Sequence, residues 1–530
     1  MMFKILDCTL RDGGYYTDWD FNRDLVDLYL HTISSLPIDI VEIGYRSPSK
    51  ESYFGEYFYL PINTIKRARE KLNSNQEIAV MINSKDINST EELEKLLTDC
   101  KGIVDMVRFA SAPNSINHSV ELALKAKSLG FAVALNIMYL SKLTIEDLHF
   151  INSIDGIVEL DYLYLVDSYG ACYPTDIAEK FSVLSSSNTN IKYGFHGHDN
   201  MELAFGNTIE AINSGAIIVD STITGMGRGA GNLKTELISI YKSNKYGQEL
   251  LYDNLVELVD KFNGLKEEYK WGASLPYIIS GMGGLPQNEV MNLMSKQRYS
   301  TLSIIESIKK APQENGNLYS NYQELDKNNI KGEFQSAIIV GGGKNLLDHT
   351  DSIVEFAKMT NSLIINSTIK NCETFIDYNL KQLVCLPGDE RSKLHTIDVA
   401  SSNLLGYILT EKTLNSSTVD FDTDKVFKIS ILSDLKDSSN EIDEDAPLAM
   451  AITTAYKLGI KIIYLAGFDG YRGITLKESY LLKENQLIIN SYNDKNNEAQ
   501  LKSLTPTLYN IERMSIYDLL GNKLTKTVLI

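Results

Sequence analysis

The 530-residue sequence has few cysteines, and their placement excludes two classes of structure. The five are Cys8, Cys100, Cys172, Cys372 and Cys385, which are odd in number, widely spaced and without a CxxC pair. Neither a disulfide framework nor a thiolate zinc site is therefore expected, and the thiols are predicted to be reduced.

Long apolar runs and an excess of basic residues are also missing. No stretch reaches 18 apolar residues, and Asp7, Arg11 and Asp12 stand where a secretory signal needs an apolar segment, so a cytoplasmic location is expected. The 51 Lys and Arg against 69 Asp and Glu give a net charge of −18, which repels phosphate backbones. Neither nucleic acid nor a membrane is predicted as a partner.

What the sequence does have is the composition of a large globular protein. Hydrophobic residues make up 43% and charged residues 23%, without a long low-complexity tract, which disfavours intrinsic disorder. The length allows a barrel of about 250 residues together with a second domain.

Short β-branched runs alternate with longer amphipathic stretches over residues 1–245, the pattern of repeated βα units. Eight such units predict an α/β fold, a (β/α)8 TIM barrel, because parallel strands need helical crossovers and eight close the ring. The predicted strands are residues 4–10, 38–45, 77–82, 106–110, 132–139, 162–167, 191–197 and 216–222.

The remainder of the chain divides into three further segments. Residues 246–325 show helical spacing of apolar positions and predict a helical extension of the barrel, and the polar stretch 326–335 is predicted to be a linker. From residue 336 a new βα pattern begins, which predicts a Rossmann-like α/β domain over 336–530.

Polar residues at the carboxyl ends of the barrel strands predict a metal site. Alternation along residues 191–197 puts His196 and His198 on one face, where the carboxylate of Asp12 can converge with them on a divalent ion. Asn232, beyond a glycine-rich turn, offers a further oxygen ligand. The alternative, a histidine pair that merely packs inside the barrel, stays open on these residues alone.

Three motifs in this order resemble the DRE-TIM metallolyases: TLRDG at 9–13, GFHGHDN at 194–200 and TGMGRGAGN at 224–232. That family includes 4-hydroxy-2-oxovalerate aldolase, hydroxymethylglutaryl-CoA lyase and the isopropylmalate and homocitrate synthases. The similarity covers about residues 3–285, and the third motif is closest to the aldolase branch. It implies a metal held by Asp12, His196 and His198, with Mn²⁺ preferred over Mg²⁺, Co²⁺ or Zn²⁺.

The resemblance also implies roles for two charged residues. Arg11 would bind the enolate oxygen of a pyruvate-like group, for which an always-charged, forked donor is suited. A salt bridge from Arg11 to Glu42 is the alternative. Glu42 itself lies in VEIGYRS, which looks like the family's second-strand motif, and would either orient Arg11 or bind the metal.

One position departs from the family. The aldolases place a histidine base shortly after RDG and the synthases place Glu-Gln there, whereas this chain has Gly13-Gly14-Tyr15-Tyr16. Tyr15 falls at the histidine position. It either takes part in proton transfer, which for a group with a pKa of about 10 favours the role of an acid, or packs as an apolar wall.

Other residues near strand ends are weaker candidates for the substrate pocket. Arg108 would bind a carboxylate or phosphate, or else form an internal ion pair. Tyr277, in the helical extension, falls where related aldolases contribute a tyrosine, and residues 167–170 resemble the family's D-T-x-G loop. The remaining candidates are Arg46, Asn83, Asn136 and Met138.

In the second domain a glycine turn follows a strand and precedes a helix. The amides of Gly341, Gly342 and Gly343, with Lys344, would hold a phosphate or nucleotide, or the glycines simply make a tight turn. Residues 445–471 faintly resemble the MptE-like pterin diphosphokinases and sialyltransferase-like Rossmann domains. That likeness implies a role for Asp469 beside a nucleotide or sugar phosphate, with helix capping as the alternative.

These observations favour a metal-dependent carbon–carbon lyase of the aldolase type. Its substrates would be a pyruvate-like 2-oxo acid, reacting through an enolate, and an aldehyde or sugar-derived partner, in the synthesis of an unusual sugar or polysaccharide. One alternative is a catalytically altered metal-binding barrel that serves as scaffold or sensor. Another is a nucleotide-dependent transferase in the C-terminal domain as the principal enzyme. A homo-oligomer is compatible with either.

Overall fold

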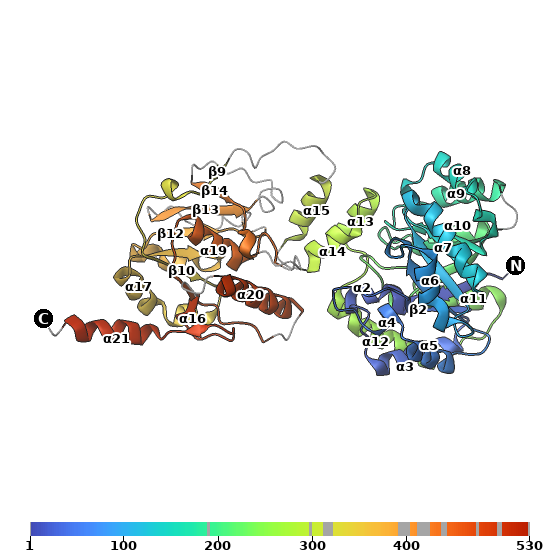
Figure 1. The fold of residues 1–530 in the computed structure, drawn as a ribbon, viewed down its shortest axis with the longest axis horizontal. Coiled ribbons are helices and arrows are strands. Elements are labelled where there is room, and N and C mark those ends of the chain that lie inside the picture. Colours follow the sequence, from blue (N-terminus) through green and yellow to red (C-terminus); the bar gives the residue numbers. More distant parts are fainter. Residues whose placement is uncertain are drawn as a thin grey trace. The chain divides into compact units, whose positions relative to one another are not determined.

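The computed structural model describes residues 2–187, 191–295, 299–310, 322–388, 390, 403–410, 425–435, 442–472, 476–495 and 501–527. The chain forms two compact units, Met1–Met291 and Asn292–Ile530 (Figure 1). No helix within the described part combines the length and apolar character needed to cross a membrane.

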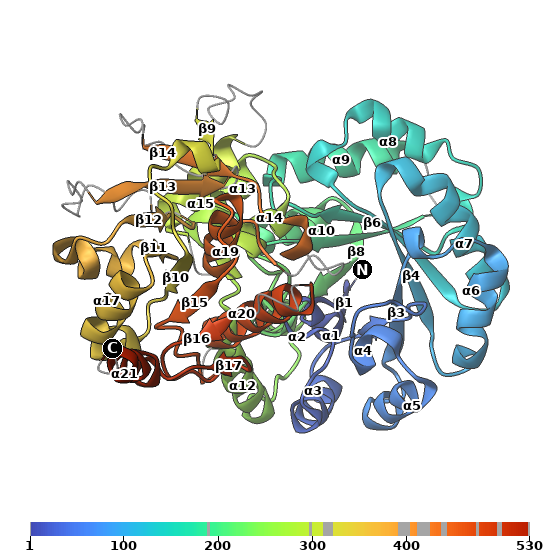
Figure 2. The ribbon, with the colours of Figure 1, turned by 60° about the vertical axis from the view of Figure 1, so that its left-hand side comes forward.

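The first unit is a closed barrel of eight parallel strands, which confirms the predicted TIM barrel (Figure 2). β1 closes the ring against β8, with Asp7 in register with Ser221. The strands are β1 Lys4–Asp7, β2 Ile40–Tyr45, β3 Glu77–Asn83, β4 Met106–Ser111, β5 Ala132–Ile137, β6 Tyr162–Asp167, β7 Lys192–Gly197 and β8 Ala216–Ser221.

Helices surround this barrel, and some of them begin at a residue whose side chain caps the first turn. Asn22, for example, accepts hydrogen bonds from the backbone N–H groups of Asp24 and Leu25 at the start of α3. The helices are α1 Thr9–Asp12, α2 Gly14–Thr17, α3 Arg23–Ser35, α4 Glu56–Tyr59, α5 Ile62–Lys71, α6 Thr90–Leu97, α7 Ile116–Ser128, α8 Ile145–Asn152, α9 Pro174–Ser187, α10 Ala204–Asn213, α11 Thr235–Tyr246, α12 Asp253–Tyr269, α13 Leu275–Met282 and α14 Gln287–Ser295.

The barrel interior changes from apolar to charged towards the carboxyl ends of its strands. Ile40, Met106 and Ile218 belong to an apolar cluster inside the barrel. The residues two positions further along the same strands, Glu42, Arg108 and Asp220, face the same interior and are fully or almost fully buried. A charged layer therefore lies between the apolar interior and the mouth of the barrel.

The first strand is shorter than predicted. β1 ends at Asp7, whose carboxylate accepts the N–H of Thr9 at 2.9 Å, and the chain then turns into α1. Arg11 and Asp12 therefore project from one helical turn over the barrel mouth and not from a strand end. The strand ends early because the Asp7 side chain binds the backbone N–H of Thr9, two residues further on, and this local hydrogen bond replaces strand pairing.

The described residues of the second unit form a sheet of nine strands, all paired in parallel, in the order β17-β16-β15-β10-β11-β12-β13-β14-β9. From the neighbours β10 and β15 the chain order runs outward to β14 on one side and to β17 on the other, and β9, which precedes β10 in the chain, forms the edge beyond β14. The strands are β9 Gln323–Glu324, β10 Ser336–Val340, β11 Ser362–Asn366, β12 Gln382–Cys385, β13 Leu404–Thr410, β14 Val426–Ile429, β15 Ile463–Ala466, β16 Lys502–Ser503 and β17 Glu512–Arg513.

Both faces of this sheet are covered by helices (Figures 1 and 2). Ala337 and Ile339 pack in one cluster with α19 and α20, whereas Ile338 and Val340 pack in another with α16, α17 and α21. The helices among the described residues of this unit are α15 Thr301–Lys310, α16 Lys344–Asp348, α17 Thr350–Met359, α19 Pro447–Lys457, α20 Leu476–Lys495 and α21 Ile516–Thr527.

The boundary between the two units falls between Met291 and Asn292, inside the segment 246–325 that was predicted as a helical extension of the barrel. Phe262 of α12 packs in the barrel's core, so the first part of the predicted extension is integral to the barrel unit, and residues 296–298 and 311–321 lie outside the described residues. Leu325 and Ile330 are buried in the second unit's core, and β9 pairs with β14. Residues 326–335, predicted as a linker, pack on the second unit because these two apolar side chains are buried there.

Candidate active site at the barrel mouth

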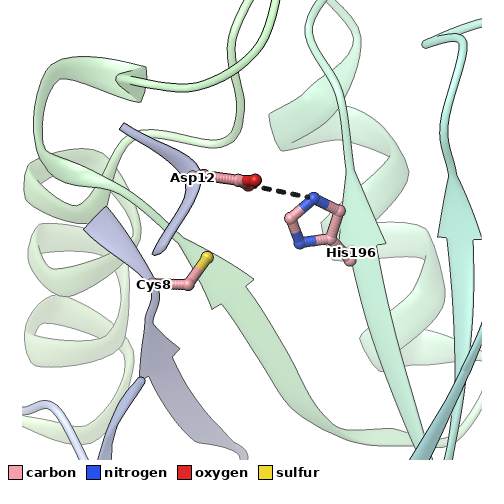
Figure 3. Close-up of side chains that lie close together, drawn as sticks. All are labelled: Cys8, Asp12 and His196. Carbon is pink, nitrogen blue, oxygen red and sulfur yellow. Dashed lines mark ion pairs between the residues drawn. The ribbon is translucent and has the colours of Figure 1, made fainter. Parts of the chain in front are cut away.

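The four predicted ligands meet over the barrel mouth. The Nε2 of His196 lies 3.5 Å from the Oδ2 of Asp12, and the two side chains point towards one another (Figure 3). The amide of Asn232 donates to the same Asp12 oxygen at 2.7 Å. The rings of His196 and His198 are 5.1 Å apart between centroids. All four side chains are buried.

The hydrogen bonds of His196 fix which ring nitrogen is free. Its Nδ1 lies 2.9 Å from Oδ2 of Asp220. Burial disfavours the charged form of Asp220, but Arg108 outweighs it and holds the pKa of that carboxyl below its usual range. Since a carboxylate only accepts, Nδ1 carries the hydrogen of this bond, and Nε2 is the ring nitrogen that faces Asp12. This carboxylate–histidine arrangement is typical of metal sites.

Two buried polar atoms of this cluster have no hydrogen-bond partner. They are Nδ1 of His198 and Oδ1 of Asn232. Burial lowers the pKa of His198 well below its usual value, and the neighbouring His196 lowers it further, so the ring is neutral. Neutral imidazoles, a carboxylate and an amide oxygen are ligands that divalent metals accept, and a bound ion would satisfy the orphaned atoms. The residues therefore fit a divalent metal.

Cys8, which the sequence patterns did not single out, lies on the inner side of this cluster. Ligand atoms of Cys8, Asp12 and His196 are all within 4.8 Å of one another (Figure 3). Burial raises the pKa of the Cys8 thiol well above its usual value. The sulfur is therefore protonated, and the thiolate is the form that binds metals.

An alternating chain of charges supports the site. Arg11 lies between Asp12 and Glu42, with its Nε 2.6 Å from Oε1 of Glu42. The other oxygen of Glu42 pairs with Arg108 at 2.9 Å, and Arg108 reaches Asp220 at 2.6 Å. The sequence left open an ion pair for Arg11 and another for Arg108, and both ion pairs are present. Arg108 is fully buried beneath the mouth.

A small cavity of about 70 Å³ opens beside these groups. Of the predicted residues it gathers Arg11, Asp12, Tyr15, Asn136, Met138, His196 and His198. Its lining also contains Tyr45, Met81, Ala110, Val166, Ser168 and Arg228. The hydroxyls of Tyr15 and Tyr45 are 3.2 Å apart, and the edge of Tyr15 packs on Trp19. Tyr15 thus has both a packing contact and a polar one.

The other predicted residues of the barrel lie outside this lining: Glu42, Arg108 and Asn232, described above, and Arg46, Asn83 and Tyr277. The guanidinium of Arg46 donates to the backbone carbonyls of Tyr59, Leu60 and Leu96. It therefore stabilises the backbone of neighbouring segments and does not face the cavity. Asn83 ends β3 and is half-buried. Tyr277 is buried in α13, where its carbonyl accepts from Asn200.

The sequence contains a signal for two residues of this site, Asp220 and Arg228, that the sequence patterns above did not single out. Asp220 occupies the position two residues after the inward-facing Ile218, and strict alternation along β8 places it in the interior. Arg228 is the one charged residue in the glycine-rich run TGMGRGAGN. Cys8 gives no such signal, because its position depends on where β1 ends.

Comparison with known proteins identifies the barrel. The HMGL-like family profile matches residues 2–245. A crystal structure of the N-terminal domain of an inferred aldolase from Bacteroides vulgatus is 40% identical, with a TM-score of 0.53, and the match covers 57% of this chain and 99% of that domain. The chain belongs to the HMGL-like family.

Curated relatives of the HMGL-like barrel are carbon–carbon lyases that act on 2-oxo acids. The 4-hydroxy-2-oxovalerate aldolase of Geobacillus genomosp. 3 is 28% identical over 237 residues, which is 44% of this chain and 68% of the aldolase. Oxaloacetate decarboxylase of Mycobacterium tuberculosis is 23% identical over 334 residues, or 61% of this chain and 95% of that enzyme. The HMGL-like barrel is thus a member of a lyase family.

The second unit has a larger cavity, of about 430 Å³, at the carboxyl ends of β10, β11, β12 and β15. Gly341, Gly342, Gly343 and Asp469 are among its lining residues, whereas Lys344 is not. Asp469 accepts the N–H of Asn345 in the first turn of α16 at 3.0 Å, and its other oxygen is buried without a partner. A Cβ on Gly343 would lie 2.4 Å from the Asp469 side chain, so close packing also accounts for this glycine.

Proposed function

We propose that the barrel is a metal-dependent carbon–carbon lyase of the aldolase type, acting on a pyruvate-like 2-oxo acid through its enolate. The observation that carries the proposal is the set of Asp12, His196, His198 and Asn232 next to the guanidinium of Arg11. Two atoms of this set that can bind a metal, Nδ1 of His198 and Oδ1 of Asn232, are buried without a hydrogen-bond partner. When bound, a divalent ion, with Mn²⁺ preferred, supplies Lewis-acid polarisation of an oxo group.

Arg11 has the position and the free donors to stabilise the oxyanion of the enolate. Its Nε is committed to Glu42 and one Nη to Asp12, which leaves further N–H groups of the fork facing the cavity that Arg11 lines. Because the ion pairs fix the guanidinium before substrate arrives, little reorganisation is needed when charge develops. Glu42 is then a positioning residue.

Tyr15 is proposed to donate a proton to the aldehyde oxygen when the enolate adds to the aldehyde. In cleavage the same proton returns from the 4-hydroxyl of the substrate to the Tyr15 oxygen as the carbon–carbon bond breaks. Its hydroxyl lies 3.2 Å from that of Tyr45 at the edge of the cavity. Burial and the neighbouring Tyr15 raise the pKa of Tyr45 well above its usual value, so Tyr45 keeps its proton. Tyr45 therefore supplies an O–H donor beside the Tyr15 oxygen, which would stabilise that oxygen while its proton is on the substrate.

A second proposal concerns the other unit, which we take to be a Rossmann-like domain that binds a nucleotide or phosphate. Ligands of parallel sheets bind outside the carboxyl ends at the point where strand order reverses, and the 430 Å³ cavity lies where β10 and β15 diverge. Titration calorimetry of the full chain with UDP and ADP tests this; a signal that Gly342→Asp leaves unchanged, or no signal, contradicts it.

The proposed lyase would make or degrade a sugar-derived 2-oxo acid, with an aldehyde as partner. The scaffold or sensor alternative predicts metal binding without turnover. Deuterium exchange into the methyl group of pyruvate and 2-oxobutyrate, followed by NMR with Mn²⁺ or Mg²⁺, separates the two. The lyase proposal predicts metal-dependent exchange that is lost in Asp12→Asn and in Arg11→Ala. Bound metal without exchange of either acid would favour the scaffold.

A further inference from the structure

Arg228 brings a second guanidinium to the barrel cavity, and its charge is not neutralised as that of Arg11 is. Arg11 is paired with Asp12 and Glu42. Among the described residues no carboxylate forms an ion pair with Arg228, whose guanidinium carbon lies 5.5 Å above the ring of Tyr15. Its side chain is half-buried, and its Nε is buried without a hydrogen-bond partner. Water does not reach that donor, and leaving it unpaired is costly.

The backbone that carries Arg228 is packed on both sides. A Cβ on Gly227 would lie 2.3 Å from the Asn232 amide, and one on Gly229, which has a φ of +68°, would lie 2.2 Å from the Gln287 side chain. The hydroxyl of Tyr16 donates to the carbonyl of Gly229 at 3.2 Å. These contacts fix the loop, so the guanidinium projects from a rigid support into the cavity.

The position of Arg228 relative to Tyr15 indicates which part of the substrate it meets. The oxo group and its adjacent carboxylate belong beside Asp12, His196 and Arg11, because the carboxylate is one bond from the oxo carbon. Tyr15 is proposed to act at the half that leaves, and Arg228 lies over the Tyr15 ring. A planar, forked cation of this kind binds carboxylates and phosphates.

We infer that the substrate is a 2-oxo acid whose leaving half carries its own anionic group, a carboxylate or a phosphate, bound by Arg228. This inference rests on the proposed lyase function and specifies its substrate class. A neutral aldehyde such as acetaldehyde would leave the buried donor of Arg228 unpaired, whereas an anionic leaving half would pair with it.

Three 4-hydroxy-2-oxo acids that all release pyruvate test the inference: 4-hydroxy-2-oxovalerate with a methyl tail, 4-hydroxy-2-oxoglutarate with a carboxylate tail and 2-keto-3-deoxy-6-phosphogluconate with a phosphate tail. Full-length protein with Mn²⁺ is assayed for pyruvate release. At least one anionic substrate is expected to exceed the methyl substrate in kcat/KM by about 10- to 100-fold, the range for hydrogen bonds to charged groups. The better of the two anionic arms identifies carboxylate or phosphate.

Arg228→Gln is expected to remove this preference, with a fall in kcat/KM at least tenfold greater for the preferred anionic substrate than for the methyl one, while Arg228→Lys retains part of it. Arg69→Gln removes the same charge from α5, remote from the cavity, and should keep the preference. A parent that prefers the methyl tail, or an Arg228→Gln variant that loses all substrates equally, would overturn the inference.

A binding measurement covers the case in which no substrate is cleaved. Both tryptophans, Trp19 and Trp271, lie in the barrel unit, so their fluorescence reports its thermal unfolding. Succinate and inorganic phosphate are the probes. Stabilisation of the parent by either probe, absent in Arg228→Gln and present in Arg69→Gln, supports the anion site even if pyruvate exchange fails. No difference between the two variants overturns it independently of the lyase proposal.

Discussion

The imidazole of His196 donates its Nδ1 hydrogen to Asp220 at 2.9 Å, which turns Nε2 towards Asp12. This pair connects the charged layer of the barrel interior to the proposed metal ligands, because Asp220 also binds Arg108. The ligand geometry is therefore set by residues that the metal itself would not contact.

Asp220→Asn should weaken metal binding without removing a ligand. The asparagine can present its NH₂ group to Nδ1, which favours the wrong tautomer, and we expect the Mn²⁺ dissociation constant to rise by about 10- to 100-fold. Electron paramagnetic resonance of free Mn²⁺ measures it, with tryptophan fluorescence to confirm that the barrel is folded. Unchanged affinity in a folded variant would contradict the role assigned to Asp220.

Arg108→Met should destabilise the barrel strongly. Arg108 is fully buried, and its loss leaves Glu42 and Asp220 with an uncompensated negative charge, which costs about 3–5 kcal/mol in such settings. Urea unfolding followed by tryptophan fluorescence measures this for the barrel unit alone. Arg69→Met, which removes a surface ion pair, is the matched control and should change the free energy of unfolding by less than about 1 kcal/mol. Equal effects in the two variants would refute the prediction.

The stability of the metal-free barrel should fall as the pH is lowered below the usual pKa of histidine. Burial, and then the neighbouring His196, hold the pKa of His198 below its usual value. Below a pH of about 6.5 the unfolded chain therefore binds a proton that the folded chain does not. Asp12 affects the stability only at lower pH. Burial opposes the charge of its carboxyl, but Arg11 lowers its pKa below the usual value, so its stabilisation is lost as the pH falls from that usual value through the lowered one.

The contribution of His198 is the difference between the parent and His198→Gln. In urea unfolding with a chelator at pH 7, 6 and 5, the slope of the unfolding free energy against pH should be larger in the parent than in the variant, by up to about 1.4 kcal/mol per pH unit. The same slope in both proteins would mean that His198 titrates normally.

Tyr15→Phe tests the proposed proton donor. The variant keeps the ring contact with Trp19 but loses the hydroxyl next to Tyr45, and we expect cleavage of a 4-hydroxy-2-oxo acid to slow by about 100-fold or more. Tyr53→Phe, at an exposed position, is the control and should retain full activity. A Tyr15→Phe variant as active as this control would leave Tyr15 with a packing role only.

Gly343→Ala should loosen the 430 Å³ cavity of the second unit. Its Cβ would lie 2.4 Å from the Asp469 carboxyl carbon, whereas the Cβ of the control, Gly342→Ala, would lie 3.2 Å from the flexible chain of Lys370. We expect a cost of about 1–3 kcal/mol for the first and little for the second. Hydrogen exchange of the peptide that contains α16, read by mass spectrometry, reports the difference; equal protection in the two variants would speak against it.

The barrel and the shared face of the two histidines were predictable because both follow from periodicity. Alternation places His196 and His198 on one face of β7, and the eight βα units close one ring. Arg46 illustrates what alternation does not determine: its guanidinium turns to the backbone carbonyls of two loops, which depends on how those loops pack. The position of Cys8 likewise depends on the strand-ending contact of Asp7.

The central claim is tested most directly by Mn²⁺ binding and its response to pyruvate. Electron paramagnetic resonance of the full chain should show one tightly bound Mn²⁺ whose spectrum changes when pyruvate is added. Arg11→Ala should keep the ion but lose the response to pyruvate, and Asp12→Asn should lose the ion. A parent that binds no Mn²⁺, or one whose bound Mn²⁺ is indifferent to pyruvate, would contradict the account.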